Sequence, residues 1–268
     1  AHWSSDLIHL MATPERVVVT DSRGNVHILD LHTGRVAIAP VTFAEGAPSK
    51  ASASWLTSTD PSEDILWMSS TKLAQMIRQK KISARDAVEA CIKRIEQVNP
   101  KLNAVVQTCF DRARAEAKAA DEALAAGRIM GPLHGVPFTI KDSLDTAGVI
   151  STGGTVGRQA YIPPEDATVV ARVRAAGAIL LGKTNTPEFT LAGGGIAGVG
   201  TTANIIYGIS KNPWDLKRST AGSSGGAGAI VAAGGASFDI GSDYGGSIRM
   251  PAHNNGTCGL KPTFGRVP

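Results

Sequence analysis

The sequence predicts an α/β protein in which a sheet is flanked by helices, preceded by a short hairpin-like β segment. Three observations predict this fold class. Residues 1–63 contain short alternating apolar runs separated by Gly-centred turns, residues 64–130 carry apolar residues at helical spacing, and residues 131–268 alternate between strands and helices. The last pattern is typical of a sheet covered by helices.

The first 63 residues are expected to form a β-meander of two or three strands followed by a linker. The predicted strands are Val17–Thr20, Val26–Asp30 and Arg35–Ala39. Gly24 and Gly34 centre the turns between them. Residues 44–63 are rich in Ala, Ser, Pro and Thr, as linkers are. We therefore expect two parts, 1–63 and 64–268.

Residues 64–130 are expected to be helical apart from one strand. Leu73, Met76 and Ile77 mark a first helix, and Ser83 with Asp86 resembles a capping box that opens a second. The apolar stripe of the second helix is Val88, Cys91, Ile92 and Ile95, and the helix is expected to end at Asn99-Pro100. A strand is predicted over Leu102–Val106 and a third helix over 110–126, stopped by Gly127.

Residues 131–268 supply the alternating part of the fold. The predicted elements are a strand at Val136–Ile140, a helix at Ala167–Ala176 capped by Asp166, a strand at Ala178–Leu181, a helix at Gly226–Ala233 and a strand at Ala236–Ile240. In such sheets the active site lies in loops beyond the strand ends.

Composition excludes several classes of function. Lys and Arg number 27 against 23 Asp and Glu, a net charge of +4 that is too mild and scattered for nucleic-acid binding. No run of 18 apolar residues predicts a membrane span, and residues 1–15 lack a signal-peptide pattern. Three cysteines without paired spacing predict a reducing, cytoplasmic location. No histidine or cysteine spacing predicts a metal site, and no cofactor is expected.

Two motifs match catalytic patterns by letter only. Gly177–Thr184 fits the phosphate-binding pattern G-x-x-x-x-G-K-T, but a helix precedes it and its variable residues read as a hydrophobic strand that Lys183 closes. Gly222–Gly226 fits G-x-S-x-G around Ser224, but no strand leads into it and His253 follows too closely for a hydrolase triad.

Polar residues occur where apolar ones are expected. Lys141 ends an apolar strand, a Gly/Ser loop at 221–229 leads into a small-residue helix, and 239–252 is a strand ending in a loop with a serine after two glycines. With Gly135–Asp142, Gly182–Phe189, Asn212–Asp215 and the run from Ala221 to Pro268, these stretches resemble the amidase signature family in order and spacing over about 64–268.

The resemblance implies a twisted mixed sheet and a Ser–cis-Ser–Lys triad. Lys141 takes the lysine position, Ser223 the bridging serine and Ser247 the nucleophile, with a cis peptide between Gly222 and Ser223. The two serines lie 24 positions apart (247 − 223), as in the family.

The residue types are consistent with this chemistry on their own. A serine hydroxyl needs a base within hydrogen-bond reach, and with no acid–His pair available a lysine is the candidate. Lysine is a base only when neutral, which requires its pKa to fall by ~3.4 units from ~10.4. Burial produces shifts of that size. Ser223 can accept a proton from one partner and donate its own to the other, so Lys141 need not touch Ser247.

The loop around the nucleophile is expected to stabilise negative charge. Backbone N–H groups of Tyr244, Gly245, Gly246 and Ser247 are assigned to an oxyanion hole. Asp243 and Arg249 are interpreted as partners that order this loop, and Gly222 and Ser224 as supporting residues. Asp142 is expected to orient the loop after Lys141 and to point away from the amine, since a nearby carboxylate would raise the pKa of the lysine.

Three functions are consistent with these residues. The first is an amidase that hydrolyses a small-molecule carboxamide through a Ser247 acyl-enzyme. The second is the glutaminase subunit of a tRNA-dependent amidotransferase, although that subgroup carries Gln where this chain has Met250. The third is an inactive fragment, because family members commonly extend beyond the Gly259–Thr263 segment. A homodimer is kept as an alternative to a monomer.

Overall fold

The computed structural model describes the backbone of residues 7–12, 16–21, 25–30, 36–40, 63–191 and 200–267, and the side chains of residues 65–191 and 200–267. The chain divides into two compact units, Ala1–Ser49 and Lys50–Pro268. The predicted boundary at residue 63 falls within the second of these units.

The first unit contains a four-stranded antiparallel meander. Its strands are β1 (Leu7–Ala12), β2 (Arg16–Asp21), β3 (Asn25–Asp30) and β4 (Val36–Pro40), which pair in sequence order. β2 and β3 cover the predicted strands Val17–Thr20 and Val26–Asp30, and β4 matches the third prediction from Val36 on. β1 was not predicted, because no glycine-centred turn sets it off in the sequence. The turn glycines and most of the predicted linker 44–63 lie outside the described residues.

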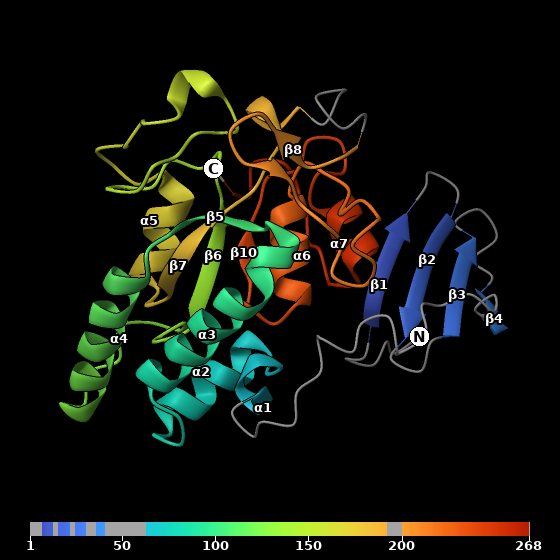
Figure 1. Cartoon of the computed structure of the whole chain (residues 1–268). Coiled ribbons are helices and arrows are strands. Elements are labelled where there is room, and N and C mark those ends of the chain that lie inside the picture. Colours follow the sequence, from blue (N-terminus) through green and yellow to red (C-terminus); the bar gives the residue numbers. More distant parts are fainter. Residues whose placement is uncertain are drawn as a thin grey trace. The chain divides into compact units, whose positions relative to one another are not determined.

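The second unit is built on a mixed sheet in the order β10-β6-β7-β5 (Figure 1). The strands are β5 (Val105–Thr108), β6 (Pro137–Lys141), β7 (Ile179–Thr184) and β10 (Asp239–Ile240). Both neighbours of β6 run parallel to it, and β5 runs antiparallel to β7. The predicted α/β class is therefore confirmed. A two-stranded ribbon, β8 (Ala203–Asn204) and β9 (Gly208–Ile209), follows β7.

Helices cover both faces of this sheet. The α-helices of the described residues are α1 (Glu63–Leu66), α2 (Ser70–Arg78), α3 (Ala84–Leu102), α4 (Phe110–Ala125), α5 (Thr168–Ala175), α6 (Gly225–Ala232) and α7 (Arg249–Asn255). Ile179 and Leu181 of β7 share a buried apolar cluster with α3, α4 and α6. On the opposite face, Phe138 and Ile140 of β6 pack with Val170 of α5. Alternation along the strands thus buries each side of the sheet under a different helical layer.

Helix α3 begins as predicted and ends later than predicted. Ser83 caps it, and Asp86 completes the capping box by accepting a hydrogen bond from the Ser83 N–H. The helix passes through Pro100 and stops at Asn103, whose backbone is left-handed with φ of 50°. The expected stop at Asn99-Pro100 is therefore wrong. Pro100 lacks an N–H and so removes one hydrogen bond of the last turn, but the helix continues for two residues until the left-handed Asn103 ends it.

The predicted cap of α5 is also wrong. Ala167 is the N-cap and makes no side-chain capping bond. Asp166 instead accepts from the Ala147 N–H at 2.8 Å and pairs with Arg174 at 2.7 Å. A carboxylate beside a guanidinium gains more from the charged pair than from one capping bond, so tertiary contact overrides the local signal.

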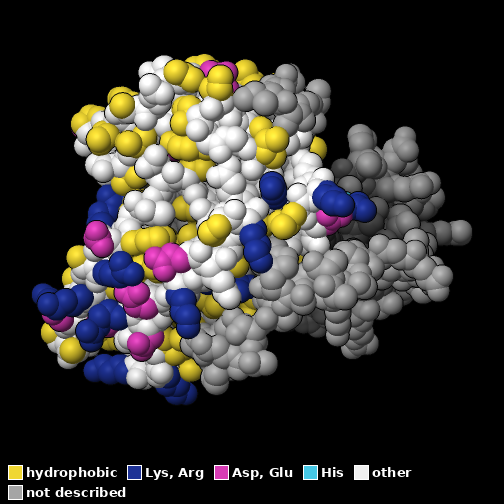
Figure 2. Space-filling view, viewed as in Figure 1, with side chains coloured by type: hydrophobic (Ala, Val, Ile, Leu, Met, Phe, Trp, Pro, Cys, Tyr) yellow, Lys and Arg dark blue, Asp and Glu magenta, His cyan; other side chains and the backbone are white. Residues whose placement is uncertain are grey.

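Charged side chains of both signs are interspersed over the region of α3 and α4 (Figure 2). Arg114 pairs with Glu89 at 2.7 Å, and Arg85 pairs with Asp121 at 3.1 Å, so the two helices are linked by opposite charges. None of the helices in the described residues is long and apolar enough to cross a membrane.

Candidate active site

The candidate site is assembled where three segments meet at the end of β6. Every residue of β6 is buried, including its last, Lys141, which has no exposed surface. β10 lies beside β6 with Ile240 opposite Ile140, and α6 packs on the same region of the sheet. Because parallel strands end at the same edge, the loop after β10 is brought to the amine of Lys141.

The amine of Lys141 is bonded to hydroxyl groups. Its Nζ donates to Ser223 Oγ at 2.7 Å and to Ser242 Oγ at 3.0 Å. Burial lowers the pKa of Lys141 from 10.5 to about 7, against the opposing charges of Asp239 and Asp243. A large share of the lysine is therefore neutral near pH 7, as a base must be.

Ser223 is held in place by the start of α6. The peptide bond between Gly222 and Ser223 is cis, as the family resemblance implies. α6 begins two residues later with glycines because there is no room for a side chain. A Cβ on Gly226 would lie 2.4 Å from the Asn185 nitrogen and 2.6 Å from the Ala104 oxygen. The helix start can therefore approach the strand ends closely.

Asp243 organises the loop that carries Ser247. Its carboxylate accepts from the N–H groups of Gly246, Ile248 and Arg249 at 2.7, 3.0 and 3.2 Å, and pairs with the Arg249 guanidinium at 3.0 Å. Burial would raise the pKa of Asp243, but these hydrogen bonds outweigh it and hold the pKa well below its usual range. Asp243 and Arg249 thus form the ordering pair that the sequence predicts.

Ser247 lies on this loop and is tied to α6 by its backbone. Its carbonyl accepts from the Ser224 N–H at 3.0 Å, and Ser224 Oγ donates to the Ser242 carbonyl at 3.4 Å. The Ser247 hydroxyl makes no hydrogen bond to Ser223 or to any other residue that the structure describes. The structure therefore joins Lys141 to Ser223 directly, while Ser247 is positioned by main-chain contact.

The predicted oxyanion hole is only partly available. The Gly246 N–H donates to Asp243 and is not free for a substrate oxygen. The N–H groups of Tyr244, Gly245 and Ser247 make no hydrogen bond within the described part of the chain, and the Tyr244 side chain is fully exposed. The sequence indicated the pair of Asp243 with Arg249, but it did not indicate that Asp243 would also take up the Gly246 N–H.

Ser242 is a contact of Lys141 that the sequence did not indicate. It contacts Lys141 because it follows β10, the parallel neighbour of β6. That pairing was the signal that could have found it. Asp142 behaves as expected: it accepts from the Thr152 hydroxyl and from the Thr152 N–H at 3.1 Å, which commits its carboxylate to the 151–155 segment.

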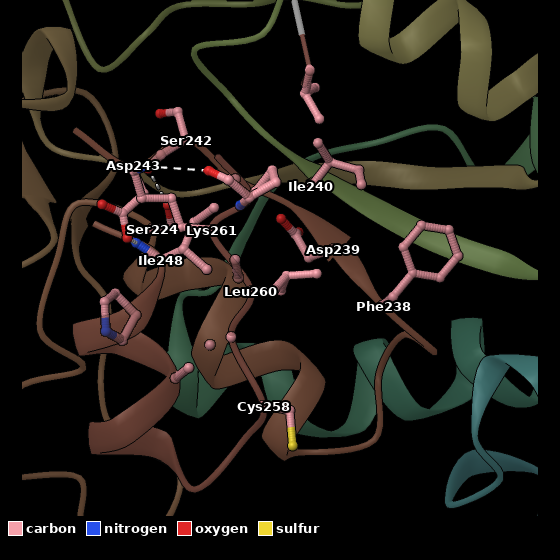
Figure 3. A pocket seen from close by; sticks show the side chains of 18 of the residues that line it. Ser224, Phe238, Asp239, Ile240, Ser242, Asp243, Ile248, Cys258, Leu260 and Lys261 are labelled. Carbon is pink, nitrogen blue, oxygen red and sulfur yellow. Dashed lines mark hydrogen bonds between the residues drawn. The ribbon is translucent and has the colours of Figure 1, made fainter. Parts of the chain in front are cut away.

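A cavity of about 830 Å³ lies beside the site. Ser224, Ser242 and Asp243 gather at one end of it, Phe238 stands at the other, and Asp239 lies between them (Figure 3). Lys141, Ser223 and Ser247 are not part of its lining. The cavity therefore borders the supporting residues and does not open onto the three residues predicted to be catalytic.

The two motifs set aside in the sequence are explained by their context. Gly177–Thr184 is largely strand β7, in which Lys183 is buried, so the segment is not a phosphate-binding loop. Ser224 is the N-cap of α6 and follows a loop, so the G-x-S-x-G match is not a strand-to-helix elbow.

Comparison with known proteins identifies relatives over this second unit. The amidase family profile matches residues 86–268. The chain is 44% identical over 204 residues to a glutamyl-tRNA(Gln) amidotransferase subunit from Moorella thermoacetica, covering 76% of this chain and 40% of that protein. It is 45% identical over 208 residues to indoleacetamide hydrolase of Bradyrhizobium diazoefficiens, covering 78% and 38%.

Solved structures of amidases are also similar to this chain. Fatty acid amide hydrolase superposes with a TM-score of 0.70 at 30% identity, covering 77% of this chain and 35% of that chain. The peptide amidase of Stenotrophomonas maltophilia gives 0.66 at 33% identity, covering 70% and 39%. The chain thus spans about two-fifths of the length of the relatives it matches.

Proposed function

The chain belongs to the amidase signature family, and from this premise we propose that it carries the acyl-transfer centre of an enzyme that hydrolyses a carboxamide C–N bond. The observation that carries the proposal is the Lys141 amine. It is buried, has a pKa lowered to about 7, and lies 2.7 Å from the hydroxyl of Ser223. An amine in this state can accept a proton at neutral pH.

The proposed reaction uses Ser247 as the nucleophile. Its Oγ attacks the amide carbon while its proton passes to Ser223, and the Ser223 proton passes to Lys141. The C–N bond of the tetrahedral intermediate then breaks, and the amine leaves with the proton returned through Ser223. Water attacks the acyl-enzyme by the same route, which releases a carboxylic acid. The free N–H groups of Tyr244, Gly245 and Ser247 are proposed to bind the oxyanion.

A serine-directed fluorophosphonate tests the assignment. Intact mass should show one adduct on the parent chain and none on Ser247→Ala. Ser69→Ala is the matched control, because Ser69 is an exposed serine whose hydroxyl caps α2. Labelling of Ser247→Ala at the parent rate would show that the nucleophile is misassigned. Absence of labelling together with non-cooperative unfolding by circular dichroism would favour the inactive-fragment hypothesis.

A glutaminase is the second candidate function. The 44% identity to the Moorella thermoacetica amidotransferase protein favours it. Met250 disfavours it, since the resemblance places Gln there in that subgroup. Ammonia release is the discriminating measurement. A glutaminase should release ammonia from glutamine alone, whereas the proposed amidase should prefer other carboxamides.

A further inference from the structure

Asp239 is a buried carboxylate on the same face of the sheet as Lys141. It lies opposite Thr139 in the pairing of β10 with β6, and Thr184 lies opposite Lys141 in the pairing of β6 with β7. Asp239 Oδ2 accepts from Thr139 Oγ1 at 2.7 Å and from Thr184 Oγ1 at 3.0 Å. Its Oδ1 is buried and has no partner among the described residues. One carboxylate is therefore fixed across three neighbouring strands.

This carboxylate could fix Lys141 in its charged form. A buried ion pair stabilises both charges, so an Asp239–Lys141 pair would keep the amine protonated. The ion pairs of the described residues include no such pair, and the amine donates instead to the hydroxyls of Ser223 and Ser242. The two threonines both bond Oδ2, and two bonds to one oxygen fix the position of the whole carboxylate, so Oδ1 cannot move to the amine without breaking them.

The other charges around Lys141 are already neutralised or directed elsewhere. Asp243, in the loop after β10, is paired with Arg249. α6 contains no charged residue, and Lys183 of β7 is bonded to the 144–151 segment. Asp239 has the largest charge effect on the pKa of Lys141, and burial raises the pKa of Asp239 itself to about 6.

We propose that Asp239 is a positioning residue that sets the uncharged fraction of Lys141, and that Thr139 and Thr184 hold it outside ion-pair distance of the amine. The inference rests on the proposed function, in which neutral Lys141 is the base. The two threonine hydrogen bonds hold the carboxylate in place, so that its charge acts on Lys141 through space but does not form a direct ion pair with the amine.

The test is a double-mutant cycle read out on the lysine itself. In the chain with ¹³C-labelled lysines, the Lys141 Cε resonance is assigned by its loss in Lys141→Met, and its pKa is followed by titration. Asp239→Asn should lower that pKa and Thr139→Val should raise it, each by about one unit, a tenfold change in the uncharged fraction. The Lys141 pKa of the double variant should match that of Asp239→Asn, because without the carboxylate the threonine has no charged group to restrain.

Thr108→Val is the matched control, since Thr108 is an exposed strand threonine on β5. Thr184→Val should raise the pKa as Thr139→Val does, and it serves as the second variant if Thr139→Val or Asp239→Asn does not fold. A Thr139→Val chain with an unchanged or lower lysine pKa would overturn the inference. So would a double variant that behaves like Thr139→Val.

The outcomes separate this inference from the proposed function. If Ser247→Ala abolishes fluorophosphonate labelling but the Lys141 pKa ignores Asp239, the inference alone fails. If the pKa follows the cycle but Ser247→Ala still labels, the proposed function fails while the electrostatic relation between Asp239 and Lys141 stands.

Discussion

Two buried lysines on neighbouring strands, Lys141 on β6 and Lys183 on β7, show that the hydrogen-bond partners of a buried amine determine its role. Both have no exposed surface, and burial lowers the pKa of each from 10.5, to about 7 and about 8 respectively. Lys183 pairs in register with Ile140, one residue before Lys141, so the two side chains point to opposite faces of the sheet.

Their hydrogen-bond partners differ in kind. Lys183 donates to the Leu144 carbonyl, to Thr146 Oγ1 at 2.8 Å and to Ser151 Oγ at 3.1 Å. The two hydroxyls donate their own protons to the carbonyls of Leu144 and Val149, so all three partners of Lys183 accept. Three acceptors require the three N–H groups of the charged amine, which anchors the 144–151 segment. Lys141 instead donates to two hydroxyls, which can donate as well as accept. Burial alone therefore does not make a base, and the partners decide the role.

The largest expected effect separates the two lysines by reactivity. Lys141→Met should reduce fluorophosphonate labelling by about 10²–10⁴-fold, the usual contribution of a general base. Its free energy of unfolding should be equal or higher, because a buried polar group is replaced by an apolar one of similar length. Labelling of Lys141→Met within tenfold of the parent would remove the distinction between the two lysines.

The next effect separates them by stability. Lys183→Met should lower the free energy of unfolding by about 1–3 kcal/mol, since it removes the amine that bonds the Leu144 carbonyl and the hydroxyls of Thr146 and Ser151. Urea denaturation at pH 7 measures this, with Lys141→Met as the matched control. Equal stabilities for the two variants would contradict an anchoring role for Lys183.

The pH dependence of stability should divide in the same way. A lysine whose pKa is lowered by folding binds fewer protons in the folded than in the unfolded chain, so stability rises with pH between the folded and unfolded pKa values. For Lys141 this window runs from about 7 to 10.5, and for Lys183 from about 8 to 10.5. Urea unfolding of the parent and of Lys141→Met should differ in slope already between pH 7 and 8. A Lys183→Met chain that loses the slope in that interval would reverse the assignment.

The smallest expected effect concerns Asp142. Its charge raises the pKa of Lys183, and its carboxylate binds Thr152. Asp142→Asn should lower the Lys183 pKa by less than about one unit and leave that of Lys141 unchanged. Titration of the two lysine Cε resonances measures both. A larger pKa shift at Lys141 than at Lys183 would contradict the conclusion that the charge of Asp142 acts on Lys183.

Local patterns predicted the elements that bear the site. β6, β7 and α6 lie where apolar runs and small residues indicated them, and the family resemblance implied that Lys141 and Ser223 are partners. The predictions failed where a contact distant in sequence competes with a local signal. Asp166 pairs with Arg174 and does not cap α5, and Ser242 reaches Lys141 through strand pairing.

The helix start that holds Ser223 imposes a rule on substitution. At Gly226, α6 touches the ends of two other segments through main-chain atoms, which have no rotamers to exchange. A methyl group added at residue 226 would push the start of α6 away from these segments. The absence of a side chain at Gly226 therefore helps to set the 2.7 Å distance between Lys141 Nζ and Ser223 Oγ.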